Sequence, residues 1–483
     1  MGIDRPLTRR DSVELWIGTY PSDDVPQPSD GGPAEAVWHA WFDRVTGRFH
    51  DLQLLCRVAS PSFLAVGRPG VLYAVSEKTE GELIVLKMDG TPARPHDEPD
   101  GEHPGRHGSE CGDQHRCEDC EQQVPEDGDQ QRPGHGGQPH PEGGGQHRSD
   151  YSAQTPRDDS TESLPPVGMT TQIVRTGGAE PCHVCVHPAL GAVVANYGSG
   201  SVAVIRLDAN GLPLPGGPHQ VLSFRGSGPV SGRQASAHAH FVFLAAGDSD
   251  TLLVSDLGSD KVRRCRIERV GQRLIEDGVA VELPAGTGPR HAVFSKDGRW
   301  LYVVGELDGR IHQVAWDGAT ASGVPVGSTP VAGRGGLSVD GCDTSSAEGF
   351  DGPQVAVCGD SPVEGFAGSA VTGGAGPSAV GCDRPPVGVQ PSHLSRVGST
   401  LIAGVRLADG LSMHRLAPDG SVGPGVFRAL PGSNPRHHLD LPPWHLVALQ
   451  GHGGVAVVDS DGRVSDVAPV PAPACIVTGV EIG

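Results

Sequence analysis

The sequence predicts a seven-bladed β-propeller, a ring of small antiparallel sheets around a central axis. The main evidence for this fold is a repeated sequence motif. Each copy has Pro-x-His or a variant, an apolar run, a turn, and a second apolar run that ends on a polar residue. About 13 to 16 residues separate the third motif residue from that polar end, which fits two short strands joined by a hairpin. Repeats of three or four short strands at periods of roughly 40 to 50 residues are typical of propellers. The six copies begin at Pro61, Pro181, His238, Pro289, Pro391 and Pro435.

The remaining elements follow in order along the chain. Residues 15–20 and 36–42 are the strands of an incomplete first blade, and residues 474–480 are the strand that completes it from the other end of the chain. Such closure protects sheet edges that would otherwise pair with other chains. Third strands are expected at residues 201–207, 261–267 and 454–458. We therefore expect one propeller over residues 13–483.

Composition supports an all-β class and excludes several functions. The 71 Gly and 43 Pro among 483 residues, with 4% aromatic residues, disfavour long helices. No run of about 18 apolar residues and no secretory leader is visible, so we expect a cytoplasmic protein that does not bind membranes. The 11 Cys are odd in number and irregularly spaced, which favours reduced thiols. We expect a monomer.

Two insertions interrupt the repeats. Residues 93–163 contain 17 acidic residues against 6 Arg, and lack Leu, Ile and Phe, so we expect an acidic disordered insertion. This segment carries about half of the net charge of -21, and the balance elsewhere has no basic cluster for nucleic acid. Residues 319–388, rich in Gly, Ser and Ala, are expected to be a second, weakly ordered insertion.

The acidic insertion also contains Cys111, Cys117 and Cys120 near several histidines. A single Cys-x-x-Cys without a second pair is a weak zinc signal. We therefore predict no metal and no other cofactor.

Hairpin geometry places the motif residues and the polar strand ends at one mouth of the central channel. The arginines there outnumber the carboxylates, and such a group requires an anion. Histidines at strand starts can instead hold neighbouring loops, and Asn196 and Asp256 are expected to close tight turns. The expected set is His183, Asn196, His240, Asp256, Arg290, His291, Glu306, His393, Arg406, Arg436, His437 and Gln450.

Several of these motifs resemble those of the lactonase family of seven-bladed propellers, which contains 6-phosphogluconolactonase and carboxy-cis,cis-muconate cyclase. The resemblance rests on Gly-Ala-Glu-Pro-Cys-His at 178–183, Ala-Asn-Tyr-Gly-Ser-Gly-Ser-Val at 195–202, His-Ala-His at 238–240 and Gly-Pro-Arg-His at 288–291. Both ends of the chain, at 16–20 and 474–477, also resemble the family. The resemblance implies that His240, Arg290 and Glu306 are catalytic and that Arg406 binds substrate.

The expected function is the hydrolysis of 6-phospho-D-glucono-1,5-lactone, in the pentose phosphate pathway, by direct attack of water. His240 or Glu306 would take the proton of the water, and a guanidinium would face the developing oxyanion. Arg406, Arg436, His183, His291 and His437 would bind the anionic lactone. Two alternatives stay open: a cyclase or hydrolase of carboxylated muconolactones, and a non-catalytic binding scaffold. Because the site groups are expected to face solvent, replacing them should change stability by little more than about 1 kcal/mol.

Deleting residues 95–162 should leave a folded propeller, because this segment lacks core-forming residues and joins strands at a turn. The melting temperature of the deletion variant should equal that of the full chain. A decrease of more than several degrees would show that the segment packs against the propeller.

Overall fold

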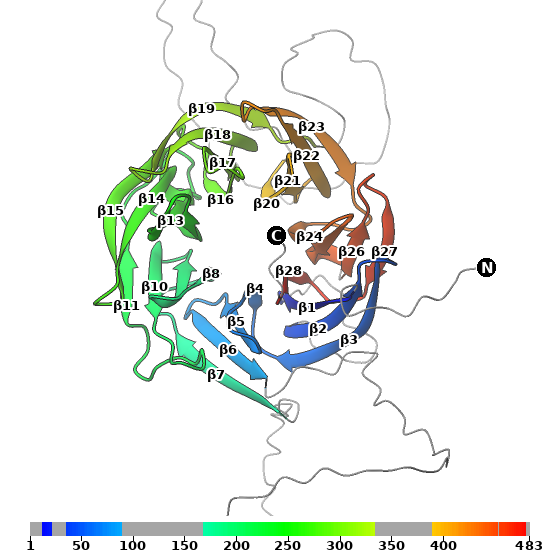
Figure 1. Ribbon diagram of the computed structural model, residues 1–483, viewed down its shortest axis with the longest axis horizontal. Coiled ribbons are helices and arrows are strands. Elements are labelled where there is room, and N and C mark those ends of the chain that lie inside the picture. Colours follow the sequence, from blue (N-terminus) through cyan, green and yellow to red (C-terminus); the bar gives the residue numbers. More distant parts are fainter. Residues whose placement is uncertain (1–11, 22–34, 89–167, 334–388, 453, 480–483) are drawn as a thin grey trace, which may run out of the picture. The chain divides into compact units, whose positions relative to one another are not determined.

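The computed structural model describes residues 12–21, 35–88, 168–333, 389–452 and 454–479. The chain divides into a unit formed by residues 1–95 and 163–483, and a second unit, residues 96–162, none of which is described. The described residues form seven four-stranded antiparallel sheets arranged around a central axis (Figure 1). The prediction of a seven-bladed β-propeller is therefore confirmed.

Each blade runs from one innermost strand at the channel to one outermost strand. The strands of the first three blades, from the channel outward, are β28 (Pro473–Thr478), β1 (Ser12–Thr19), β2 (Ala36–Asp43) and β3 (Arg48–Arg57); β4 (Pro61–Val66), β5 (Val71–Ser76), β6 (Glu82–Met88) and β7 (Met169–Arg175); and β8 (Pro181–His187), β9 (Gly191–Asn196), β10 (Ser201–Ile205) and β11 (Gln220–Ser223).

The other four blades continue around the ring, and two short 3-10 helices follow second strands. These elements are β12 (Ala239–Ala245), β13 (Asp248–Asp256), η1 (Leu257–Ser259), β14 (Lys261–Glu268) and β15 (Arg273–Glu282); β16 (Pro289–Phe294), β17 (Trp300–Gly305), β18 (Arg310–Asp317) and β19 (Ser322–Pro330); β20 (Pro391–Val397), β21 (Thr400–Val405), β22 (Gly410–Leu416) and β23 (Val422–Ala429); and β24 (Pro435–Leu441), β25 (Trp444–Leu449), η2 (Gln450–His452), β26 (Gly454–Val458) and β27 (Val464–Ala468).

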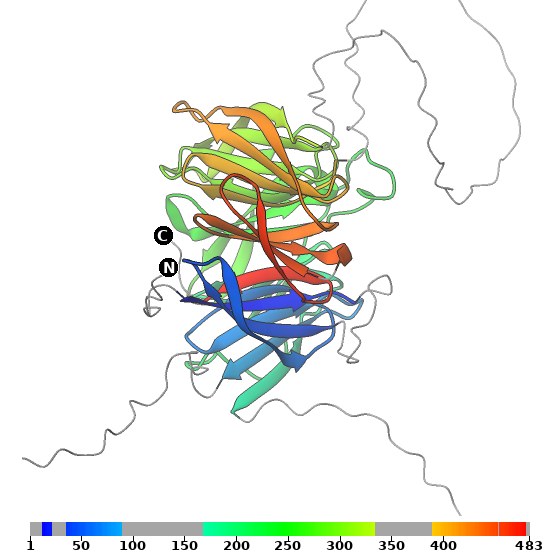
Figure 2. The ribbon, with the colours of Figure 1, turned by 90° about the vertical axis from the view of Figure 1, so that its right-hand side faces the viewer.

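The two ends of the chain share a blade, as the sequence predicted. Strand β28 pairs antiparallel with β1, with Ile476 opposite Ile17 and Cys475 opposite Gly18. Figure 2 shows the red C-terminal strands beside the blue N-terminal strands. The innermost strands of neighbouring blades also contact each other around the ring. The fold therefore closes through backbone hydrogen bonds between segments from opposite ends of the sequence.

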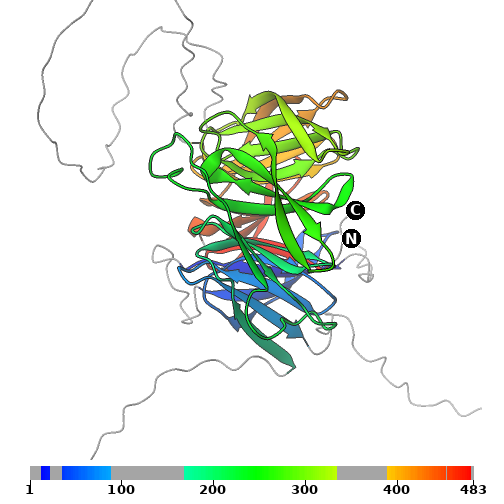
Figure 3. The ribbon, with the colours of Figure 1, turned by 90° about the vertical axis from the view of Figure 1, so that its left-hand side faces the viewer.

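Apolar side chains hold adjacent blades together. Among the described residues, seven buried clusters occur, and each lies between two neighbouring sheets. Figure 3 shows the green blades that enclose one of them, between β12–β15 and β16–β19. The second strands supply uninterrupted apolar runs because both of their faces are covered by a neighbouring blade, as in Leu252, Leu253 and Val254.

Every innermost strand carries a β-bulge directly after its first residue. In β8, Pro181 pairs with Asn196 and His183 pairs with Ala195, so Cys182 has no residue opposite. The same one-residue excess occurs in the other six innermost strands. Six of the seven begin with proline, which suits a first position because it needs no N–H donor there. Because a bulge changes the direction of the side chain at the extra residue, the second residue of each innermost strand is a candidate site residue.

The structure corrects the boundary of the second insertion. Residues 322–330, which the sequence assigned to the Gly- and Ser-rich insertion, form the outermost strand β19. This strand pairs with β18 along its length, while Val324 and Val326 are exposed. An edge strand of this kind is held by backbone hydrogen bonds and needs few buried side chains, so its composition resembles that of a loop.

The acidic insertion, residues 93–163, lies outside the described residues, as does the part of the second insertion from 334 onward. None of the helical segments in the described ranges has the length and apolar character needed to cross a membrane.

Ring closure predicts the effect of a core substitution in β28. Ile476 is fully buried in the cluster that contains Leu15, Ile17 and Leu446. Ile476→Ala should lower the free energy of unfolding by about 3 kcal/mol, because it removes packed methyl groups and leaves a cavity. Chemical denaturation measures this change. Val467→Ala, on the exposed face of β27, is the control and should cost less than about 0.5 kcal/mol; equal effects would contradict the prediction.

Candidate active site

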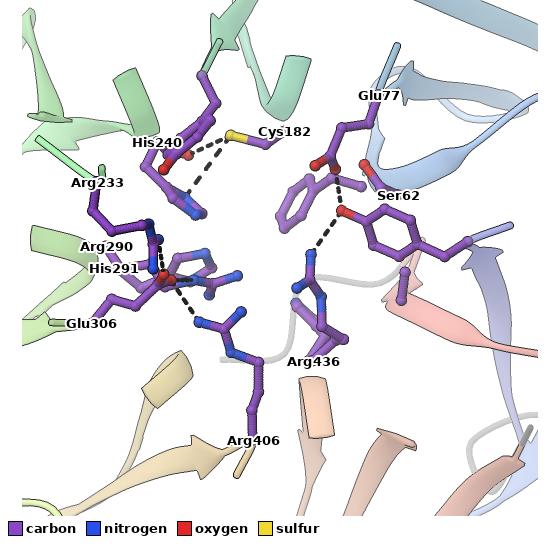
Figure 4. A pocket seen from close by; sticks show the side chains of 15 residues that line it. Ser62, Glu77, Cys182, Arg233, His240, Arg290, His291, Glu306, Arg406 and Arg436 are labelled. Atoms are coloured by element: carbon purple, nitrogen blue, oxygen red, sulfur yellow. Dashed lines mark hydrogen bonds and ion pairs between the residues drawn. The ribbon is translucent and has the colours of Figure 1, made fainter. Parts of the chain in front are cut away.

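A polar cavity of about 170 Å³ lies at the channel end where the innermost strands begin. Cavities of about 150 Å³ hold a small organic ring, so this one has room for a small ligand. Bulged second residues of the innermost strands supply the first group of lining side chains (Figure 4). They are Ser62, Cys182, His240, Arg290, Arg436 and Ala474.

The residues that directly follow the second strands supply the other main group. Hairpin geometry returns these residues to the end of the blade where the first strand starts. In this group the lining residues are Tyr20, Glu77, Tyr197, Glu306 and Arg406. Arg233 joins them from the loop between β11 and β12, outside the repeated positions.

The third residues of the innermost strands close the channel beneath the cavity. Phe63, Phe241 and the imidazoles form a continuous set of ring contacts, for example His393 stacked on His437 at 4.0 Å between centroids. His183 packs between Phe63 and Phe241, at 4.3 and 4.4 Å. Burial holds the pKa of His183 and of His437 at about 3, so both rings are neutral.

A second cavity lies on the other side of these rings and is lined by the far ends of the innermost strands, including Val66 and Thr478. His437 contributes to both cavities. The layer of rings therefore separates the two ends of the channel.

Glu306 is the centre of the charged side of the first cavity. Its Oε2 lies 2.9 Å from Arg290 Nε and 2.7 Å from Arg406 Nη2, and its Oε1 lies 2.5 Å from Arg233 Nη2. Gln390 Nε2 donates to Oε1 at 3.5 Å. Burial alone would raise the pKa of Glu306, but Arg406 and Arg290 outweigh burial and hold that pKa well below its usual value. Glu306 is therefore ionised and surrounded by donors.

The opposite wall contains a smaller charged group. Arg436 Nη2 donates to the Tyr20 hydroxyl at 2.7 Å, and its guanidinium lies over the Tyr20 ring at 4.7 Å. The same hydroxyl contacts the carboxylate of Glu77. Burial raises the pKa of Tyr20, so the phenol is neutral and donates to Glu77. This wall is electrically balanced, with one cation and one anion.

The cavity as a whole has an excess of positive charge. Among its described lining residues are four arginines, Arg233, Arg290, Arg406 and Arg436, and two carboxylates, Glu77 and Glu306. Burial lowers the pKa of both Arg290 and Arg406 in spite of the attraction of Glu306, so these cations are under-compensated. Arg406 Nε is buried without a hydrogen-bond partner among the described residues. An anionic ligand would stabilise this arrangement.

His240 supplies an imidazole to the wall of the cavity. Burial and Arg290 hold its pKa well below the usual value, so the ring is neutral at pH 7. Cys182 Sγ lies 3.9 Å from its Nδ1 and donates to its backbone carbonyl at 3.3 Å. Burial raises the pKa of the Cys182 thiol, which keeps it protonated. The pair is therefore a neutral imidazole beside a neutral thiol.

The structure brings together seven of the eight side chains proposed from the sequence. His240, Arg290, His291, Glu306, Arg406, Arg436 and His437 line the cavity. His183 does not, because it occupies a third position among the packed rings. His240 occupies a second position, one residue earlier in the strand than its motif suggested, since β12 begins at Ala239.

Other members of the expected rim have structural roles. Asp256 caps η1 by accepting from Gly258 N and also pairs with the buried Arg263. Asn196 donates to Ser201 Oγ at 3.2 Å. The turn-closing roles expected for Asp256 and Asn196 are therefore confirmed.

Sequence reasoning missed Tyr20, Glu77, Tyr197, Cys182 and Arg233 as lining residues. The first three directly follow second strands, as Glu306 does, so aligning the repeats on Glu306 would have identified them. Cys182 occupies the bulged position that Arg290 has in β16. Arg233 lies in an irregular loop, and no periodic signal marks it.

The expectation that the site groups face solvent is wrong. Arg290 and Glu306 are 5% and 4% exposed, and each is the other's ion-pair partner. Removing Glu306 leaves Arg290 and Arg406 buried without their shared carboxylate, and removing Arg290 takes one of the buried partners from Glu306. Either change to a buried ion-pair cluster is costly. Stability changes well above 1 kcal/mol are therefore expected at these two positions.

The described residues thus form a seven-bladed propeller with an arginine-rich cavity at one end of its central channel. Residues 154–331 match the family described as "Lactonase, 7-bladed beta-propeller". That segment includes Arg233, His240, Arg290 and Glu306. The resemblance to the lactonase family drawn from the sequence motifs is thus confirmed.

Curated relatives match over a limited length. The chain is 30% identical over 142 residues to 6-phosphogluconolactonase of Formosa agariphila, which is 29% of this chain and 39% of that protein. It is 30% identical over 140 residues to 6-phosphogluconolactonase of Bacillus subtilis, covering 28% and 37% of the two proteins. The matches therefore span about two fifths of the length of these relatives.

Solved structures share the fold over nearly the whole length. The periplasmic gluconolactonase of Pseudomonas aeruginosa has a TM-score of 0.62 at 20% identity, covering 97% of this chain and 99% of that chain. A protein from Lactobacillus plantarum has a TM-score of 0.62 at 18% identity, with the same coverage. At this identity the likeness concerns the fold alone.

The pairing of Glu306 predicts a pH-dependent stability difference. Glu306→Gln should lower the free energy of unfolding at pH 7 by about 3 to 5 kcal/mol, because three arginines lose their shared anion. Since the folded-state pKa is lowered, the stabilisation is fully present above the usual value of about 4.5 and is lost as pH falls below it. Denaturation curves of both proteins at pH 7 and at pH 3 to 4 measure this. Glu268→Gln, in the surface pair with Arg273, is the control and should change the free energy of unfolding far less.

Proposed function

We propose that the cavity hydrolyses a lactone that carries an anionic group, with 6-phospho-D-glucono-1,5-lactone as substrate. The observation that carries the proposal is the excess of arginines over carboxylates in a cavity that also contains a neutral imidazole. The relatives named 6-phosphogluconolactonase support the choice of reaction. The pathway role follows from this substrate: the reaction would belong to the pentose phosphate pathway, in the cytoplasm.

His240 acts as the general base in the proposed reaction. It takes a proton from water as the water oxygen bonds to the lactone carbonyl carbon. The carbonyl oxygen becomes an oxyanion, and the C–O bond of the ring then breaks as the imidazolium returns the proton to the leaving ring oxygen. A neutral ring at pH 7 is the protonation state that this role requires.

The arginines divide into two roles. Arg290 stabilises the oxyanion, because it lies beside His240 in the second-position set and is under-compensated by Glu306. Arg406 and Arg436, from neighbouring blades, bind the anionic group of the substrate, and their forked donors suit phosphate or carboxylate. His291 and His437 form the floor under the ligand.

Glu306, which the sequence suggested as a possible general base, positions the arginines in the proposed reaction. A carboxylate with a strongly lowered pKa and donors on both oxygens is a poor base at pH 7. It instead holds Arg290 and Arg406 in position. His183, beneath the cavity, supports the floor and does not bind substrate.

Two other functions remain to be separated by experiment. A carboxylated muconolactone would use the same arginines, and a panel of lactones assayed by acid release distinguishes it from a phosphorylated sugar lactone. Absence of turnover with every lactone would favour a non-catalytic scaffold that binds an anion.

His240→Ala and Arg290→Ala should each lower kcat/KM for 6-phospho-D-glucono-1,5-lactone at least about a hundredfold, because each removes a group that acts in the transition state. Arg406→Ala should mainly raise KM, and the defect should be smaller for the uncharged D-glucono-1,5-lactone. Steady-state assays of acid release measure these effects. Arg299→Ala, in an exposed surface pair, is the control and should keep wild-type rates. If both Arg290→Ala and Glu306→Gln kept wild-type rates, this cavity would not be the active site.

A further inference from the structure

Arg233 differs from the other cavity arginines in its origin and its exposure. It comes from the loop between β11 and β12, whereas the other three occupy repeated positions of the blades. Its side chain is 37% exposed, whereas those of Arg290 and Arg406 are 6% and 11% exposed. Arg233 therefore lies at the rim of the cavity, where a ligand enters.

The backbone that carries Arg233 is fastened to the blades. The neighbouring Gln234 is 1% exposed and donates through Nε2 to Leu257 O at 2.8 Å and to Asp260 Oδ1 at 2.7 Å. Asp260 Oδ1 also accepts from Gly288 N at 2.7 Å, directly before the strand that contains Arg290. One carboxylate thus positions both the rim loop and the start of β16.

The loop is also held on either side of this point. Arg263 Nη2 donates to Arg225 O at 2.6 Å near its start. At its end, His238 N donates to Asp256 Oδ1 at 2.7 Å, and the His238 ring stacks on Tyr197. Since the backbone is fixed, the side chain of Arg233 is the part of the loop that can turn toward a ligand.

Glu306 can release Arg233 without losing its other partners. Arg233 contacts Oε1, which also accepts from Gln390, whereas Arg290 and Arg406 hold Oε2. A ligand anion at the rim can therefore compete for Arg233 while the buried ion pairs persist. Its planar fork suits two oxygens of a phosphate or a carboxylate.

We propose that Arg233 is a specificity-determining residue that contacts the anionic group of the bound substrate and favours charged over uncharged lactones. This inference rests on the proposed function. It adds a third anion-binding arginine to Arg406 and Arg436, and it places the charged end of the substrate toward the rim between β11 and β12.

The test compares Arg233→Gln and Arg233→Lys with Arg225→Gln, which removes an exposed arginine from the same loop. Arg233→Gln should lower kcat/KM for 6-phospho-D-glucono-1,5-lactone about tenfold or more, mainly through KM, because a charged hydrogen bond is lost. It should change kcat/KM for D-glucono-1,5-lactone less than about threefold. Arg233→Lys should restore part of the loss, and Arg225→Gln should match the wild type. Equal losses for both lactones, or no loss for either, would overturn the proposal.

Titration with inorganic phosphate by calorimetry separates this inference from the proposed function. If the wild type hydrolyses no lactone, the proposed function fails. The role of Arg233 in anion binding is then judged by whether Arg233→Gln weakens phosphate binding relative to Arg225→Gln. Unchanged phosphate affinity in that case overturns it. Arg233→Lys keeps the charge and serves as the test variant if Arg233→Gln does not fold.

Discussion

One buried carboxylate holds the charged half of the cavity together. Glu306 pairs with Arg290, Arg406 and Arg233, which come from different parts of the ring. Three guanidiniums at this depth repel each other and lose hydration, so a shared anion is a condition for their convergence. Arg290 is in the same blade as Glu306, Arg406 is in the next blade, and Arg233 comes from the loop that leads to β12. Packing between neighbouring blades therefore brings these side chains together.

The channel floor complements this charged cluster. A layer of neutral imidazoles and phenylalanines blocks the channel below the cavity, so water cannot surround the buried ion pairs from that side. In a site of low effective dielectric, interactions between fixed charges and a ligand anion are strengthened. The same burial keeps His240 neutral. The strength of the buried ion pairs and the neutral state of His240 thus both depend on the packing that keeps water out of the cavity.

The sequence predicted the number of blades and the closure by residues 474–480, because short apolar strands and their turns repeat with a regular period. It also predicted His240, Arg290, Glu306 and Arg406 as neighbours, since their motifs lie at equivalent points of the repeat. Arg233 was not predicted because its loop lies outside the repeated sequence motif. Strand β19 was not predicted because an edge strand needs few apolar residues. The burial of Arg290 and Glu306 was also missed, since burial depends on side chains from neighbouring blades.

The bulge at the start of each innermost strand has a consequence for how this protein can change over evolution. A bulged residue has no residue opposite it in the sheet, so exchanging its side chain leaves the backbone ladder intact. Positions such as Ser62 and Ala474 already show that small side chains are compatible with the same strand geometry as Arg290. The propeller thus offers a set of equivalent positions around a single axis, and the side chains at these positions can differ while the strand pairing of the scaffold stays the same.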